Sequence, residues 1–123
     1  MSAGKYTMTI EQGATFQLQF QYTDAAGTPI DITDYSGRLQ IRPDYADYTT
    51  QSYAYVSSSI DADGTGLTIG SSGSIGLYIS AAVTEGFDFD EGLYDLELQS
   101  GSYVTRLLEG AVKIRREVTR QDG

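Results

Sequence analysis

The chain has 123 residues, of which 40% are hydrophobic and 11% aromatic. This suits one folded domain with a two-layer core and argues against a disordered chain. The formal net charge of −9 repels phosphates and anionic lipids, so neither nucleic acid nor a membrane is an expected partner. The chain has no His and no Cys. This excludes Ser-His-Asp and Cys-His nucleophilic sites, thiol chemistry and disulfides, and removes the usual zinc ligands.

Membrane and export signals are not expected either. No apolar run approaches the roughly 20 residues that span a bilayer. The residues after Met1–Lys5 lack the apolar block of a signal peptide.

Alternation of apolar and polar residues with a period of two runs through the first half and predicts strands. An early strand is expected over residues 6–10. The clearest run is Phe16 to Tyr22, where a Gln separates each apolar residue from the next. A short strand around Leu39 and Ile41 ends at Pro43, and another is expected over residues 53–56.

The second half continues the pattern. Strands are expected at 67–69 and 75–79, joined by a turn, and a helical turn over 80–85 ends at Gly86. Further strands are expected at 94–98 and 103–114, with a β-bulge at Gly110. The sequence therefore predicts an all-β sandwich of about 7–9 short antiparallel strands over residues 1–114. An extended C-terminal arm over residues 115–123 is expected to follow.

The stretch Asp90-Glu91-Gly92-Leu93-Tyr94-Asp95-Leu96 narrows the fold class. In immunoglobulin-type sandwiches, a Tyr near the start of the penultimate strand hydrogen-bonds to upstream backbone, and a Cys follows two residues later. Tyr94 matches the tyrosine and Leu96 takes the place of the cysteine. We therefore expect an immunoglobulin-like sandwich without a disulfide, with Tyr94 and Leu96 as structural residues. The fold alone does not reveal the function.

One acidic segment resembles the opening of a calcium-binding loop. Asp61 and Asp63 lie in the run Asp61-Ala62-Asp63-Gly64-Thr65, but the twelfth position of a complete loop would be a Glu and is Ser72 here. Asp and Gly are also common turn formers. A turn is the favoured interpretation, and a calcium site at Asp61 and Asp63 is the alternative.

A second acidic cluster is formed by Asp88, Asp90 and Glu91. It could bind a cation or a basic tail of another subunit, although a solvated loop is the preferred interpretation. Catalysis by a carboxylate pair needs a cleft between the two groups, and a sandwich of this size rarely has room for one. We therefore expect a protein that is not an enzyme and has no cofactor.

Two groups of residues are candidates for an interface. Exposed Tyr is favoured at protein interfaces, and one region holds Tyr45, Tyr48, Tyr53 and Tyr55. The alternative places these rings in the core, with their hydroxyls at its rim. The second group lies in residues 106–123, which carry five basic and three acidic side chains in an otherwise acidic chain; it consists of Arg115, Arg116 and Arg120. These arginines could meet acidic neighbours or could simply protect an edge strand from aggregation.

Several stretches occur in a recognisable order. They are Gly13-x-x-Phe-x-Leu-x-Phe20, Gly27-Thr28-Pro29-Ile30-Asp31-Ile32-Thr33 before Tyr35, Gly92-Leu93-Tyr94-Asp95-Leu96-Glu97-Leu98, and Thr105-Arg106-Leu107-Leu108-Glu109-Gly110. This order resembles small structural proteins of tailed-bacteriophage virions. In particular, it resembles the immunoglobulin-like N-terminal domain of baseplate upper proteins, which hold receptor-binding proteins on the tail.

The resemblance implies a non-enzymatic virion component, made in the host cytoplasm and present in multiple copies beside other tail, baseplate, fibre or capsid proteins. In baseplate upper proteins a fibre-forming extension follows this domain. Because the sequence stops at Gly123, a tail, baseplate or fibre-attachment adaptor is expected, docking by strand addition to an exposed edge. A capsid decoration (cement) protein is the alternative. A carbohydrate-binding module that uses the tyrosine group as a sugar platform is weaker, because Trp, the stronger stacking residue, is absent.

Overall fold

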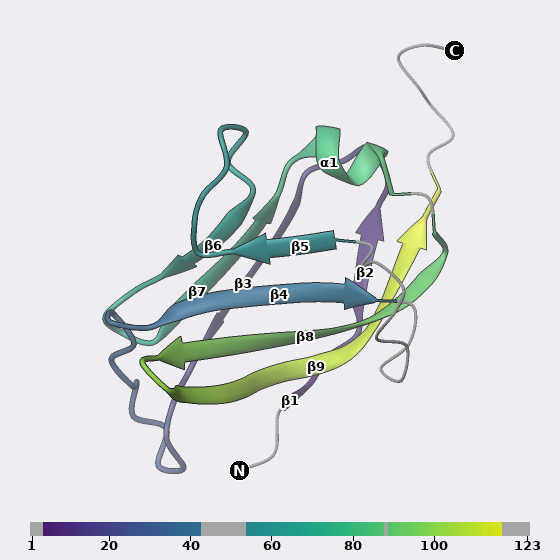
Figure 1. Ribbon diagram of the computed structural model, residues 1–123. Coiled ribbons are helices and arrows are strands. Elements are labelled where there is room, and N and C mark those ends of the chain that lie inside the picture. The colour runs from purple at the N-terminus through teal and green to yellow at the C-terminus, as the bar shows by residue number, and fades with distance from the viewer. Residues whose placement is uncertain (1–3, 43–53, 88, 117–123) are drawn as a thin grey trace.

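The computed structural model describes residues 4–42, 54–87 and 89–116, which form two β-sheets packed face to face (Figure 1). The first sheet has the order β1-β9-β8-β4-β5, with β2 also paired to β9. Its strands are β1 (Gly4–Lys5), β2 (Met8–Glu11), β4 (Ser36–Arg42), β5 (Ala54–Ser57), β8 (Glu91–Ser100) and β9 (Tyr103–Arg115). The second sheet has the order β3-β7-β6 and consists of β3 (Phe16–Gln21), β7 (Ser74–Ile79) and β6 (Gly66–Ile69).

This topology confirms the immunoglobulin-like sandwich. Such folds place their second, fourth and fifth strands in one sheet and their third, sixth and seventh in the other, and the variable type adds strands beside the third. Here β3, β6 and β7 form one sheet, while β4, β8 and β9 form the other with β5 added beside β4. The expectation of purely antiparallel pairing was wrong at one edge. Both β1 and β2 run parallel to β9, because the N-terminal segment lies beside the last strand.

The core lies between the sheets and follows the period of two seen in the sequence. Leu39 on β4 faces Leu96 on β8, and Leu96 in turn faces Leu108 on β9. Leu39 and Leu96 are almost fully buried, as are Ile75 and Ile79 on the opposite sheet. Burying each such side chain stabilises the fold by roughly 1.5–3 kcal/mol, so these inward rows fix which face of each strand meets solvent.

A single helical turn, α1 (Ala81–Glu85), connects the sheets where the sequence predicted one. Ser80 caps its N-terminus by accepting a hydrogen bond from the Val83 N–H, and Gly86 ends it. The buried Thr84 hydroxyl donates to the Ala14 carbonyl and accepts from the Gly13 N–H. Through these bonds α1 holds the turn that leads into β3.

The β-bulge expected at Gly110 lies elsewhere. Gly110 pairs in register with Tyr94, and the register between β8 and β9 shifts at Leu107 instead: Leu96 faces Leu108, while Glu97 faces Arg106. Two adjacent leucines cannot both point inward from a strand with a period of two. The extra residue at Leu107 absorbs this conflict.

Gly110 has a different role, as the point where the N-terminal segment lies closest against β9. A Cβ atom at this position would overlap the carbonyl oxygen of Tyr6. The same carbonyl accepts a 2.7 Å hydrogen bond from the hydroxyl of Tyr94, whose side chain is 1% exposed. In immunoglobulin domains the corresponding tyrosine bonds to backbone a few residues upstream, whereas Tyr94 reaches a residue 88 positions away. The bond therefore ties the N-terminal strand to the core.

Candidate interaction face

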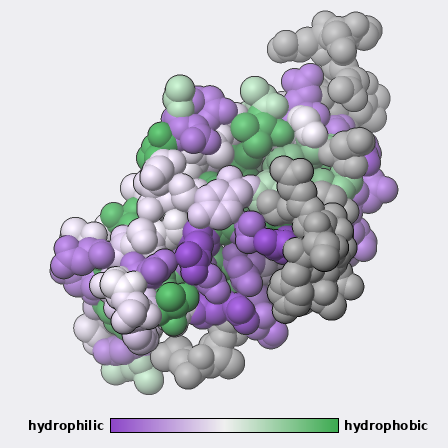
Figure 2. Space-filling view, viewed as in Figure 1, coloured by the Kyte–Doolittle hydropathy of each residue, from purple (hydrophilic) through white to green (hydrophobic). Residues whose placement is uncertain are grey.

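Charge is divided unequally between the two sheets. The strands β3, β6 and β7 contain no charged residue. Every Lys and Arg in the described ranges lies in a strand of the first sheet or directly after it, namely Lys5, Arg38, Arg42, Arg106, Lys113, Arg115 and Arg116. Figure 2 shows hydrophilic residues gathered over β4 and β8 in the middle of the first sheet's outer face. We call the outer surface of β4, β5, β8 and β9 the charged face.

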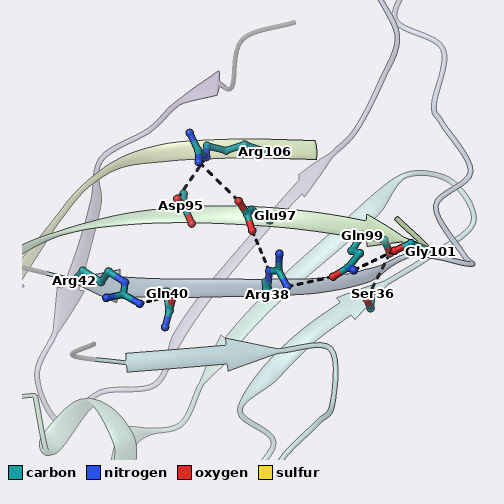
Figure 3. A network of polar contacts seen from close by, with 9 residues as sticks. All are labelled: Ser36, Arg38, Gln40, Arg42, Asp95, Glu97, Gln99, Gly101 and Arg106. Atoms are coloured by element: carbon teal, nitrogen blue, oxygen red, sulfur yellow. Dashed lines mark hydrogen bonds and ion pairs between the residues drawn. The ribbon is translucent and has the colours of Figure 1, made fainter. Parts of the chain in front are cut away.

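The centre of the charged face is a ladder of alternating charges that crosses three strands (Figure 3). Glu97 on β8 lies between two arginines. Its Oε1 accepts a 2.9 Å hydrogen bond from Nε of Arg38 on β4, and its Oε2 lies 3.8 Å from Nη2 of Arg106 on β9. Gln99 extends the ladder by accepting a 3.1 Å bond from Arg38 Nη1. Because exposed ion pairs contribute only about 0–1 kcal/mol each, the ladder adds little stability, and its main consequence is the pattern of charge on this face.

The bulge at Leu107 is what places Arg106 in this ladder. If the register set by Leu96 and Leu108 continued without a bulge, Arg106 would lie opposite Leu98, which is fully buried and points into the core. With it, Arg106 lies opposite Glu97 and points outward. Bulges commonly re-aim a side chain in this way. The doublet Leu107-Leu108 was the sequence signal for this site, and the strand prediction did not use it.

Asp95, on the charged face, is an acidic group whose ionised form is disfavoured by its surroundings. Burial raises the pKa of Asp95 above its ordinary value, the nearby Glu97 carboxylate raises it further, and Arg106 opposes both. The Arg106 Nε atom lies 3.4 Å from Asp95 Oδ2, so the pair is loose. Ionised Asp95 is therefore only partly compensated within the chain, and a cation from a partner would stabilise it.

Polar and apolar side chains border the ladder. Tyr55 on β5 pairs with Gln40 on β4 and is 56% exposed. Val104 on β9 pairs with Gln99 and is 45% exposed. These two side chains add apolar contact area beside the charges, and Tyr is among the residues enriched at protein interfaces.

The structure locates some of the expected interface residues. Tyr55 lies on the charged face, whereas Tyr45, Tyr48 and Tyr53 lie outside the described residues. Arg115 is the last residue of β9, and its guanidinium lies 3.3 Å from Glu11. Arg116 follows directly and lies 2.9 Å from Asp90. Both arginines therefore contact acids of their own domain, while Arg120 is outside the described part of the chain.

The segment around Asp61 and Asp63 forms a tight turn. The Asp61 carbonyl accepts from the Gly64 N–H, and Gly64 has a φ of 92°. One Asp63 carboxylate oxygen accepts from the Thr65 N–H at 2.9 Å, and the other accepts from the Ser80 hydroxyl at 2.7 Å. These two bonds lower the pKa of Asp63. Asp63 thus fastens the start of β6 to the cap of α1, the geometry of a turn.

Among the residues that the structure describes, no group of three or more His, Cys, Asp or Glu side chains lies close enough together to hold a metal ion. In the same residues no helix has the length and apolar character needed to cross a membrane.

Comparison with known proteins bears on the fold alone. No protein-family model matches the chain, and no curated protein sequence matches it. A marsupial T cell receptor has a similar structure, with a TM-score of 0.48 and 13% sequence identity. The similarity covers 93% of this chain and 51% of the receptor chain, so this chain spans about half of the receptor chain's length.

Proposed function

We propose that this protein is a non-enzymatic structural component of a tailed-phage virion, and that its charged face docks on a neighbouring virion protein. The virion assignment depends on the resemblance of the sequence to baseplate-associated domains. The choice of face depends on the geometry of the first sheet. A tail, baseplate or fibre-attachment adaptor is the role that this resemblance favours.

The observation that carries the proposal is the ordered ladder formed by Arg38, Glu97 and Arg106. Charges of both signs in a defined order across the strands select a partner by matching its pattern of charge. Binding of a nucleic acid would instead require a uniformly positive surface. Since the ladder is already formed within the chain, docking would order few additional side chains, which reduces the entropy lost on binding.

Antibody labelling of purified particles tests the virion assignment. Antibodies raised against the purified domain are applied to tailed particles from the same source, and the label is located by electron microscopy. Label at the tail, baseplate or fibre attachment supports the adaptor. Label over the capsid would replace it by the decoration alternative, and particles without label would reject both.

A fourfold charge inversion tests the choice of face. Arg106 also contacts Asp95, so the signs of both are exchanged with those of the ladder, by Arg38→Glu, Asp95→Lys, Glu97→Arg and Arg106→Glu. This keeps opposite charges adjacent but reverses the pattern offered to a partner. We expect the variant to fold with a similar melting temperature and to be lost from particles. A control variant, Thr68→Lys, adds a charge to an exposed position on the other sheet and should be incorporated normally. Normal incorporation of the inverted variant would exclude the charged face as the docking surface.

A further inference from the structure

The outer edge of β3 is an unpaired strand edge in the part of the chain that the structure describes. β3 is the terminal strand of its sheet and pairs only with β7. Just beyond the paired residues of β3 and β7, the Tyr22 N–H donates to the Gly73 carbonyl. Since the backbone groups of successive residues in a strand point to opposite sides, this bond shows which residues of β3 face β7. Phe16, Leu18 and Phe20 therefore direct their backbone groups to β7. The backbone N–H and C=O groups of the intervening glutamines point away from the sheet.

The edge of β3 lacks the features that normally prevent an edge strand from pairing with another chain. Natural edges are protected by charged residues, prolines, bulges or short length. The described edge strands β5 and β6 have four residues each, and the edge formed by β1 and β2 is interrupted and carries Lys5 and Glu11. β3 has six residues, Phe-Gln-Leu-Gln-Phe-Gln, with no charge, no proline and no register shift against β7.

Apolar surface accompanies the open edge. Phe16, Leu18 and Phe20 pack against the core but are only partly buried, while the corresponding inward residues of β7, Ile75, Leu77 and Ile79, are buried to 2% exposure or less. The side chains of β3 therefore remain accessible along the boundary of the sandwich. A strand added beside β3 would cover them and would satisfy its outward backbone groups at the same time.

From these observations we propose that two copies of this chain associate through their β3 strands, in antiparallel register about Leu18. The sequence Phe16-Gln17-Leu18-Gln19-Phe20 reads the same in both directions, so it is complementary to itself under a two-fold axis. Leu18 would face its own copy, and each Phe16 would face Phe20 of the other chain. Gln17 would face Gln19 in a hydrogen-bonded pair, which agrees with the outward direction of the backbone groups of both.

The distribution of charge also favours a second copy of this chain as the partner of β3. The chain carries a net charge of −9, so two copies repel each other over most approaches. The strands of the second sheet carry no charge, and β3 is where two copies can meet with the least repulsion. This interface lies on the sheet opposite the charged face, so it goes beyond the proposed function and does not depend on it.

Paired substitutions at exposed positions test both the interface and its register. In sedimentation velocity from about 100 µM to about 1 mM, the mass of the wild-type chain should rise to that of two 13.4 kDa chains. The double variant Gln17→Lys/Gln19→Lys places two like charges opposite each other on both sides of the axis, and its mass should fall to that of one chain. The double variant Gln17→Lys/Gln19→Glu places opposite charges together and should restore the mass of two chains.

A charge-matched control separates local from general effects. Thr68→Lys/Ser71→Lys adds the same two charges at exposed positions of β6 and the turn after it, and this variant should remain a dimer. The proposal is overturned by a wild-type chain that stays monomeric up to about 1 mM. It is equally overturned by a double-lysine β3 variant that remains a dimer, and the register is overturned if the Lys/Glu variant is monomeric. Circular dichroism of each variant confirms that the sandwich is retained.

Discussion

Replacing Tyr94 by Phe would remove one hydroxyl from the core and, with it, the bond that ties the N-terminal strand to the sandwich. The hydroxyl donates to the Tyr6 carbonyl at 2.7 Å, and the ring is 1% exposed, so water does not readily take its place. A hydrogen bond contributes about 1 kcal/mol net, and up to about 2 kcal/mol when its loss leaves the partner unsatisfied. We therefore expect the free energy of unfolding to fall by about 1–2 kcal/mol. For a domain of this size, that lowers the melting temperature by about 4–8 °C.

The assay is urea unfolding followed by circular dichroism. The midpoint should fall while the slope of free energy against urea stays constant, because the surface exposed on unfolding does not change. Amide exchange should accelerate first in β2, whose pairing with β9 adjoins Tyr6. Tyr55→Phe, at an exposed phenol, is the matched control and should change stability little. A Tyr94→Phe variant as stable as the wild type, with β2 equally protected, would refute the role given to this bond.

Two other substitutions test the geometry of β8 and β9. Gly110→Ala drives a methyl group into the Tyr6 carbonyl and should lower the free energy of unfolding by about 1–3 kcal/mol. Gly86→Ala meets only ordinary contacts and should have a much smaller effect, so equal effects in urea unfolding would contradict this account. Asp95→Asn removes a carboxylate whose pKa is raised by burial. Since a raised pKa means that stability is lost as pH rises through it, the variant should be more stable than the wild type at pH 7 by up to about 1 kcal/mol. The gain should disappear below the ordinary Asp pKa of about 3.9, and a variant less stable at pH 7 would show that the Arg106 contact outweighs burial.

The sequence was sufficient to predict the sandwich because its strands follow a strict period of two. The run around Leu18 and the helical turn ended by Gly86 lie where the pattern placed them. The bulge was misplaced because Gly110 was treated as a local signal. What requires a glycine there is the close approach of the Tyr6 carbonyl, which is distant in sequence. The unpaired edge of β3 could not be predicted either, because it depends on the order of the strands in the assembled sheet.

The candidate site was less predictable. Arg38, Glu97 and Arg106 lie far apart in the sequence and meet only because β4, β8 and β9 are neighbours in a particular register. The alternation of charged residues along β4 and β8 shows that they point outward, but it does not reveal which residues face each other. The contacts of Arg115 with Glu11 and of Arg116 with Asp90 also depend on the position of β9 between β2 and β8.

Whether the charged face is the docking surface of a virion protein is tested most directly by a cryo-microscopy reconstruction of tailed particles from the same source as this chain. We expect sandwich density at the tail or baseplate, with the ladder of β4, β8 and β9 against a neighbouring protein. A sandwich attached with this face open to solvent, or a particle without the sandwich, would contradict it.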